Sequence, residues 1–137
     1  MTGSAVFLDT SALYAVFDGD DASHDRAARA WRDLLDTSAA LHTSSYVLVE
    51  LQALLQRRLG VDAMDALSAY LLPFVNVVWV DERVHAQASA AQLGARRRDV
   101  SFVDHASFVI MRALGIRRAF ALDRHFAEQG FDVLPAA

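Results

Sequence analysis

Ala5-Val6-Phe7-Leu8-Asp9 is the stretch that decides the fold, because four apolar residues run without interruption into a single aspartate. A short run of this kind predicts a β-strand that is buried on both faces. Such strands belong to parallel sheets that carry helices on each side. Ligands of these sheets bind outside the carboxyl ends of the strands, so we expect Asp9 to lie at a functional edge.

The rest of the chain alternates predicted helices and strands. Further strands are expected near residues 41–43 and at 75–80, 118–122 and 132–134. Helices are expected from about residue 11, over 23–36, from 44 or 45 to 59, and over 61–72, 82–93 and 101–114. This order predicts a three-layer α/β/α fold around a central, mainly parallel sheet of about five strands.

Glycines indicate where several of these helices end. Gly60, Gly94, Gly115 and Gly130 each follow a helical pattern. A residue without Cβ is favoured there because it adopts a left-handed cap without steric cost.

The composition limits the classes of protein to which this chain can belong. A chain of 137 residues with 54% apolar residues suits one domain, which we expect to span residues 1–137. No apolar run approaches the roughly 20 residues of a membrane span, and the first residues lack the basic start of a secretory signal. Cysteine is absent, which excludes thiolate metal sites and thiol nucleophiles and agrees with the cytoplasm.

Charge is distributed unevenly along the chain. The formal net charge is -4, but residues 94–125 contain seven arginines against three aspartates, a local balance of +4. This half of the chain could therefore hold phosphate groups. Its arginines are Arg96, Arg97, Arg98, Arg112, Arg117, Arg118 and Arg124.

Four acids are candidates for a shared site. Asp9 and Asp123 each follow a predicted strand, although an aspartate in that position can simply cap the next helix. Glu50 stands in a helix that is apolar on every side, where a shielded carboxylate needs a cation; Arg57, seven residues later, is the structural alternative. Asp104 follows Ser101 at capping-box spacing, so it too could be a cap.

The convergence of these acids is more informative than any one of them. Hard carboxylate oxygens from four segments suit Mg²⁺ or Mn²⁺ rather than Zn²⁺. The five histidines lack the paired helical spacing of a zinc site, and His105 and His125 are better placed for a supporting or phosphate-contacting role. Glycine-rich nucleotide loops are absent, and so is the lysine that phospho-acceptor receiver domains require.

Four motifs in this order resemble those of PIN-domain ribonucleases, and of VapC-type toxins within that family. They are Phe7-Leu8-Asp9-Thr10-Ser11-Ala12-Leu13, Thr43-Ser44-Ser45-Tyr46-Val47-Leu48-Val49-Glu50, Ser101-Phe102-Val103-Asp104 and Leu122-Asp123-Arg124-His125-Phe126. The similarity extends over nearly the whole chain. One departure is that Ala121-Leu122 precedes the last acid, where relatives often have a threonine.

The resemblance implies hydrolysis of RNA by a water activated by Mg²⁺ or Mn²⁺. It assigns Asp9, Glu50, Asp104 and Asp123 as metal ligands and Ser11 as a residue that orients a ligand or contacts the substrate phosphate. It makes the arginines candidates for guiding the RNA backbone, foremost Arg96, Arg97, Arg98 and Arg124.

The resemblance also implies a homodimer and a small antitoxin protein as partner. Two alternatives remain open on the residues alone. One is a catalytically idle α/β module that binds RNA or a protein, and the other is a PIN-like nuclease that acts on DNA.

Overall fold

A computed structural model of the chain describes residues 5–136. The strands are β1 (Ala5–Leu8), β2 (Ala40–Ser44), β3 (Asn76–Val78), β4 (Arg118–Phe120) and β5 (Asp132–Leu134). The helices are α1 (Thr10–Phe17), α2 (His24–Asp36), α3 (Ser45–Leu59), α4 (Asp62–Tyr70), α5 (Glu82–Ala95), α6 (Phe102–Leu114) and α7 (His125–Glu128), with a 3-10 turn η2 (Leu72–Phe74).

The five strands form one sheet in the order β3-β2-β1-β4-β5, and every neighbouring pair is parallel. The predicted α/β fold with a parallel sheet is confirmed. The chain first moves from β1 outward to β3 and then crosses back to β4, on the other side of β1. The strand order therefore reverses between β1 and β4, which is where open α/β sheets place their ligands.

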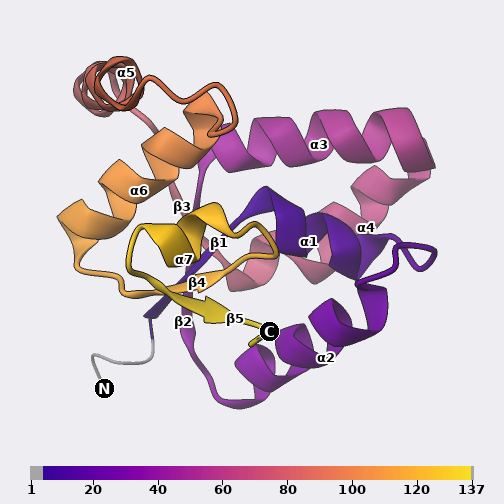
Figure 1. Cartoon of the computed structure of the whole chain (residues 1–137). Helices are drawn as coiled ribbons and strands as arrows, with labels where there is room; N and C mark the ends of the chain where they lie inside the picture. Colours follow the sequence, from indigo (N-terminus) through magenta and orange to yellow (C-terminus); the bar gives the residue numbers. More distant parts are fainter. Residues whose placement is uncertain (1–4, 137) are drawn as a thin grey trace.

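Helices cover the sheet in two groups (Figure 1). Connections between parallel strands are right-handed, so the reversal after β3 puts α1–α4 against one face and α5–α7 against the other. The packing agrees, because α1 contacts α2 and α3, whereas α5 packs mainly on α6. This is the predicted three-layer arrangement.

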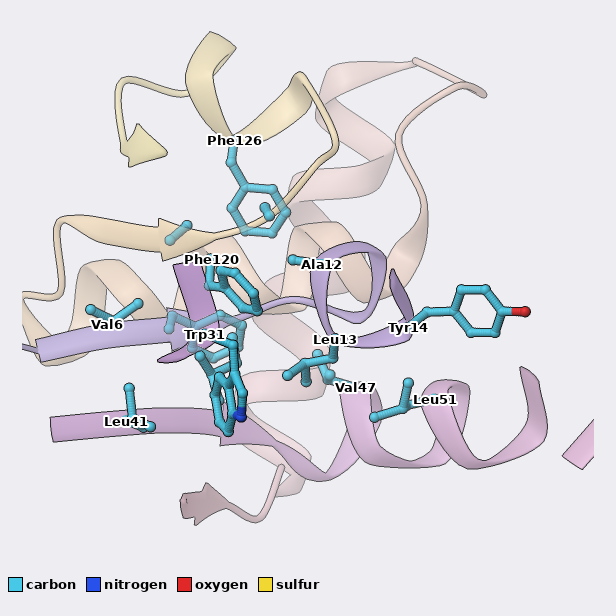
Figure 2. Close-up of a cluster of buried hydrophobic side chains, with 14 of the residues drawn as sticks. Val6, Ala12, Leu13, Tyr14, Trp31, Leu41, Val47, Leu51, Phe120 and Phe126 are labelled. Carbon is cyan, nitrogen blue, oxygen red and sulfur yellow. The ribbon is translucent and has the colours of Figure 1, made fainter. Parts of the chain in front are cut away.

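The core forms where both helix layers meet β1 and β4. Val6, Phe7 and Leu8 of β1 have no exposed surface, as expected of a strand covered on both faces. Figure 2 shows Trp31 of α2 beside Phe120 of β4, and their ring centroids are 6.0 Å apart. Burial of each large apolar side chain contributes about 1.5–3 kcal/mol to the free energy of unfolding. The core is therefore packed against β1 and β4, the two strands between which the strand order reverses.

Several predicted boundaries shift. Gly60, Gly115 and Gly130 have positive φ, as predicted for helix ends. Gly94 does not end its helix, because α5 continues to Ala95 and Arg96 takes the left-handed cap with φ 54°. The helix expected over 61–72 ends at Tyr70 and gives way to η2. The short helix α7 was indicated only by the helical pattern before Gly130, and no bounds were predicted for it, since four residues are too few to show a full period.

Within the described residues, no helix combines the length and the apolar character that a membrane crossing requires.

Candidate functional site

A cavity of about 530 Å³ opens at the carboxyl ends of β1 and β4. Five acids and one arginine are among the side chains that line it: Asp9, Glu50, Asp99, Asp104, Asp123 and Arg57. All four acids predicted as ligands therefore reach one space, although they come from four separate segments. Such convergence is expected at a point where the strand order reverses.

Asp9 joins the ends of β1 and β4. Its backbone N–H donates to the carbonyl of Phe120 at 2.9 Å, and its side chain caps α1 by accepting from the Ser11 N–H at 3.1 Å. The carboxylate also accepts from the Ser11 hydroxyl, whose oxygen in turn accepts from the Leu122 N–H at 2.9 Å. Ser11 thus fixes the Asp9 rotamer and holds the loop after β4, so both its hydrogen-bonding capacities have partners in the protein.

Burial makes ionised Asp9 unfavourable. The side chain is 3% exposed. Its pKa is raised to about 6, first because burial removes water and then because Glu50 and Asp123 add negative charge; the bonds from Ser11 offset only part of this. A nearby cation would favour the ionised form.

Asp104 projects from the first turn of α6. Ser101 caps this helix by accepting from the Asp104 N–H at 3.0 Å, so the predicted capping interaction exists. The Asp104 carboxylate is nevertheless buried against the cavity, with 7% exposure. Its pKa is raised to about 7 by burial and then by the charges of Asp9 and Asp123. The backbone N–H of Asp104 takes part in the helix cap, whereas its carboxylate lines the cavity.

Asp123 and His125 form a turn beside Asp104. The Asp123 carboxylate accepts from the His125 N–H at 2.8 Å. The ring Nδ1 of His125 lies 2.7 Å from Asp123 Oδ1 and 3.5 Å from Asp104 Oδ2, and its Nε2 lies 3.4 Å from Asp99. Neither ring nitrogen is aligned for a hydrogen bond, so these contacts are charge interactions rather than directed bonds.

The His125 ring responds to the acids around it. Burial lowers the pKa of His125, but Asp123, Asp99 and Asp104 together outweigh this and raise it. One donor atom each from Asp104, Asp123 and His125 lie within 4.8 Å of one another, which is compact enough to hold a metal ion. His125, expected only in a supporting role, thus stands among the possible ligands.

Glu50 reaches the cavity from α3, but not as a fully shielded residue. Its exposure is intermediate, and the neighbouring Val49 is 68% exposed. The prediction that α3 is buried on every side here is wrong, because apolar composition on one turn does not say which side the core covers. Among the described residues no ion pair within 4.0 Å joins Glu50 to Arg57, although both line the cavity.

The predicted phosphate-binding arginines divide into two groups. Arg97 contacts Asp99 at 2.7 Å and Glu128 at 3.1 Å, and Arg124 contacts Glu128 at 3.3 Å and Asp99 at 3.7 Å. These four residues are called the surface ion network below. Arg96 and Arg98 are exposed and have no ion pair in the described part of the chain.

Asp99 is the site residue that sequence reasoning missed. It lies in the loop before α6, lines the cavity and contacts both Arg97 and His125. Nothing in the sequence pattern distinguishes it from an ordinary loop aspartate, because its contacts join residues that are 2, 25 and 26 positions apart.

The donor chemistry of the cavity fits a divalent cation. In residues 5–136, no arginine lies within 4.0 Å of the carboxylates of Asp9, Glu50, Asp104 or Asp123. Buried carboxylates without a paired cation are costly, and hard oxygen donors suit Mg²⁺ or Mn²⁺. Acids gathered where the strand order reverses thus fit a metal site at the edge of a parallel sheet.

Comparison with known protein families identifies the family to which this chain belongs. Residues 6–132 match the PIN domain, so the chain belongs to the PIN-domain family, a family of nuclease enzymes. The resemblance seen in the four motifs is confirmed.

Particular relatives lie among the VapC toxins of Mycobacterium tuberculosis. The chain is 37% identical to the 23S rRNA-specific endonuclease VapC20 over 127 residues, covering 92% of this chain and 95% of that protein. It is 33% identical to the ribonuclease VapC26 over 130 residues, covering 89% and 90%.

Two solved structures are similar to this chain over most of its length. The crystal structure of VapC20, described as a sarcin–ricin loop cleaving toxin, superposes with a TM-score of 0.82 at 36% identity and covers 92% of this chain and 95% of that one. FitAcB from Neisseria gonorrhoeae has the same fold, with a TM-score of 0.66 at 16% identity over 93% of this chain and 95% of its own.

Proposed function

We propose that this protein is a Mg²⁺- or Mn²⁺-dependent endoribonuclease, built as one PIN-like domain, that acts in the cytoplasm as the toxin of a toxin–antitoxin pair. The observation that carries the proposal is the cavity into which Asp9, Glu50, Asp104 and Asp123 converge without a balancing arginine. The similarity to VapC20 and VapC26 supports ribonuclease chemistry.

The acids of this chain would hold the cation and position the phosphodiester. Asp9 and Asp104 are the most buried, so they would bind it most directly, with Glu50 and Asp123 completing the set. When bound, the ion would stabilise negative charge on the scissile phosphate and lower the pKa of an attacking water. Ser11 would keep Asp9 in place through its hydroxyl, as a positioning residue.

Ribosomal RNA is the substrate class to test first. VapC20 is described as specific for 23S rRNA and as cleaving the sarcin–ricin loop, and it shares 37% of its aligned residues with this chain. We propose that this protein also cleaves a structured RNA loop, where a phosphodiester is accessible to a concave site. Arg96 and Arg98 would contact the RNA backbone; in support, both are exposed and make no ion pair within the described residues.

Two protein partners are part of the proposal. A toxin needs an inhibitor, so an antitoxin is expected to cover the acidic cavity. A homodimer is supported by large exposed apolar side chains around the edge strand β3: Tyr70 is 68%, Phe74 53% and Trp79 74% exposed. Single exposed apolar residues are common, but three within ten positions favour an interface.

The decisive experiment compares wild type with Asp9→Asn, both purified free of any partner. Each is incubated with ribosomes, total RNA and single-stranded DNA, with Mg²⁺ or Mn²⁺ and with EDTA. The proposal predicts RNA cleavage by wild type that needs the metal and is lost in the variant. Asp33→Asn, an exposed change of the same charge on α2, is the matched control and should cleave normally.

The alternatives give different results. Preferential cleavage of DNA would reassign the protein as a DNA nuclease with the same chemistry. RNA binding without cleavage, together with no uptake of Mn²⁺, would contradict the enzymatic proposal and identify an idle binding module.

A further inference from the structure

A second cavity, of about 260 Å³, adjoins the acid-lined cavity. Asp123 lines both, so the two spaces meet at a residue of the proposed site. The walls come from the first turn of α2, from the loop between β4 and α7, from α7 itself, and from β5 with the residue that follows it. Figure 1 shows the end of β5 beside α2, which agrees with the residues that these elements contribute.

The floor of this cavity is apolar. Ala121 is 1% exposed, and Leu122, Val133 and Pro135 are half-buried. Because these side chains offer no hydrogen-bonding groups, the floor suits a flat, weakly hydrated surface rather than an ion. Phosphate alone would be a poor occupant, since the carboxylate of Asp123 stands at the boundary and repels negative charge.

Two guanidinium groups border the same cavity. Arg26 of α2 is exposed and makes no ion pair within 4.0 Å in the described part of the chain. The Arg124 side chain is 75% exposed, and its contacts with Glu128 and Asp99, at 3.3 and 3.7 Å, are long. Exposed ion pairs of this kind contribute little, so Arg124 can exchange them for a ligand at small cost.

An apolar floor with a positive border is the chemistry of a nucleotide site. Unstacked RNA bases are held by packing against apolar and guanidinium planes, while arginine contacts the phosphate beside them. The cavity volume of about 260 Å³ is enough to hold a single heterocycle.

We propose that this cavity binds the base of the RNA nucleotide adjacent to the scissile phosphate, with Arg26 and Arg124 contacting the backbone phosphate of that nucleotide. The inference rests on the proposed ribonuclease activity and deepens it. Holding one base in a pocket that opens onto Asp123 would bring the next phosphodiester into the acid-lined cavity. The pocket would therefore select an unstacked nucleotide, which occurs in loops rather than in helices.

The first test removes the base from the substrate. An RNA oligonucleotide cleaved by wild type is mapped and then synthesised with an abasic ribose on one or the other side of the cleaved bond. We expect kcat/KM to fall about tenfold on one side and clearly less on the other, the size of effect seen when one stacked base is lost.

The second test fills the cavity. Ala127→Trp, from α7, would occupy the space of the base. It should lower kcat/KM on intact RNA by a similar factor and cause no further loss on the abasic substrate, because base and indole compete for one space. If this variant melts below the assay temperature, Ala127→Leu replaces it as a smaller filler.

The third test addresses the arginines. Arg26→Ala should raise KM several-fold with little change in kcat, since it removes a backbone contact made before and during the reaction. Arg29→Ala, an exposed arginine three residues further along α2 that lines neither of the two cavities, is the matched control and should leave KM unchanged.

The possible failures are distinguishable. Equal cleavage of intact and both abasic RNAs would overturn the base pocket and leave the ribonuclease standing. No RNA cleavage by wild type under any metal condition would overturn the proposed function and the pocket with it. If Ala127→Trp cleaves RNA normally but no longer binds a purified protein partner, the pocket serves that partner and the inference is wrong.

Discussion

The acid-lined cavity and the surface ion network lie side by side and use the same kind of side chain to opposite effect. In the cavity, burial and mutual repulsion raise the pKa of Asp9 to about 6 and that of Asp104 to about 7. In the network, contact with the Arg97 guanidinium lowers the pKa of Asp99 to about 2 and also lowers that of Glu128.

The difference between the two regions lies in where the positive charge is. The network contains its own cation in Arg97, which pairs with both Asp99 and Glu128, so these two acids are balanced without a ligand. In the cavity, the four acids Asp9, Glu50, Asp104 and Asp123 have no arginine within 4.0 Å in the described residues, and His125 contacts only two of them. The site therefore stays electrostatically unfavourable until a further cation enters. A protein retains such a destabilising group of acids where function requires it.

The largest expected effect is that of Asp104→Asn. Replacing a proposed metal ligand should reduce RNA cleavage by more than the roughly 10- to 100-fold that follows loss of a mere ligand-supporting residue. The same change should raise the metal-free unfolding free energy at pH 8 by roughly 1–3 kcal/mol, because it removes a buried carboxylate whose folded-state pKa is raised. Cleavage assays and urea denaturation in EDTA measure both.

Asp99→Asn is the comparison for that variant. It should lower the melting temperature slightly, because it removes the acid that pairs with Arg97, and it should retain most of the cleavage activity. If Asp99→Asn abolished cleavage as fully as Asp104→Asn, the distinction between cavity and network would fail.

The second prediction concerns pH. For Asp9 and Asp104 the folded-state pKa lies above the unfolded value of 3.8, so their stabilising contribution is complete below about pH 4 and is lost as pH rises through 6 to 7. For Asp99 the folded pKa is depressed, so its contribution is present above pH 4 and is lost as pH falls toward 2.

Thermal melts in EDTA between pH 4 and 8 check this. Between about pH 4 and 7 the wild-type melting temperature should fall more steeply than that of Asp104→Asn, because only there does the folded state bind the Asp104 proton that the unfolded state has lost. Parallel curves for the two proteins would show that the Asp104 carboxylate is not destabilised in the folded state.

The smallest predicted effect is a difference between Arg98 and Arg97 in the salt dependence of RNA binding. Arg98→Ala should weaken RNA binding at every salt concentration and reduce the salt dependence of the binding constant by about one unit of slope, as for loss of one phosphate contact. Arg97→Ala should change the slope less and the melting temperature more, because Arg97 already pairs with two acids. Equal slopes for the two variants would mean that Arg97 also binds RNA.

Sequence reasoning identified the parts of the site that strand topology controls. Asp9 and Asp123 were predicted because the carboxyl ends of parallel strands share one edge, and Asp104 because a first-turn acid projects toward that edge. Glu50 was predicted to reach the site, but its exposure was misjudged, since apolar composition does not reveal that α3 turns Val49 to solvent.

The interactions between side chains could not be predicted. Whether Arg97 binds RNA or pairs with Asp99 and Glu128 depends on how the loop before α6 folds against α7, a helix too short for its bounds to be predicted. The contacts of His125 with three acids depend on the same loop. Patterns of single residues locate strand ends, whereas pairing across loops requires the tertiary structure.

Calorimetric titration of the metal-free protein with Mn²⁺ at pH 6.5 tests most directly whether the cavity is built for a cation. Wild type should bind Mn²⁺ and release protons, seen as a heat that depends on the ionisation enthalpy of the buffer, because Asp9 and Asp104 are partly protonated at this pH. Asp104→Asn should bind much more weakly. Binding of equal strength in both proteins, or none in wild type, would contradict the assignment of these acids as a metal site.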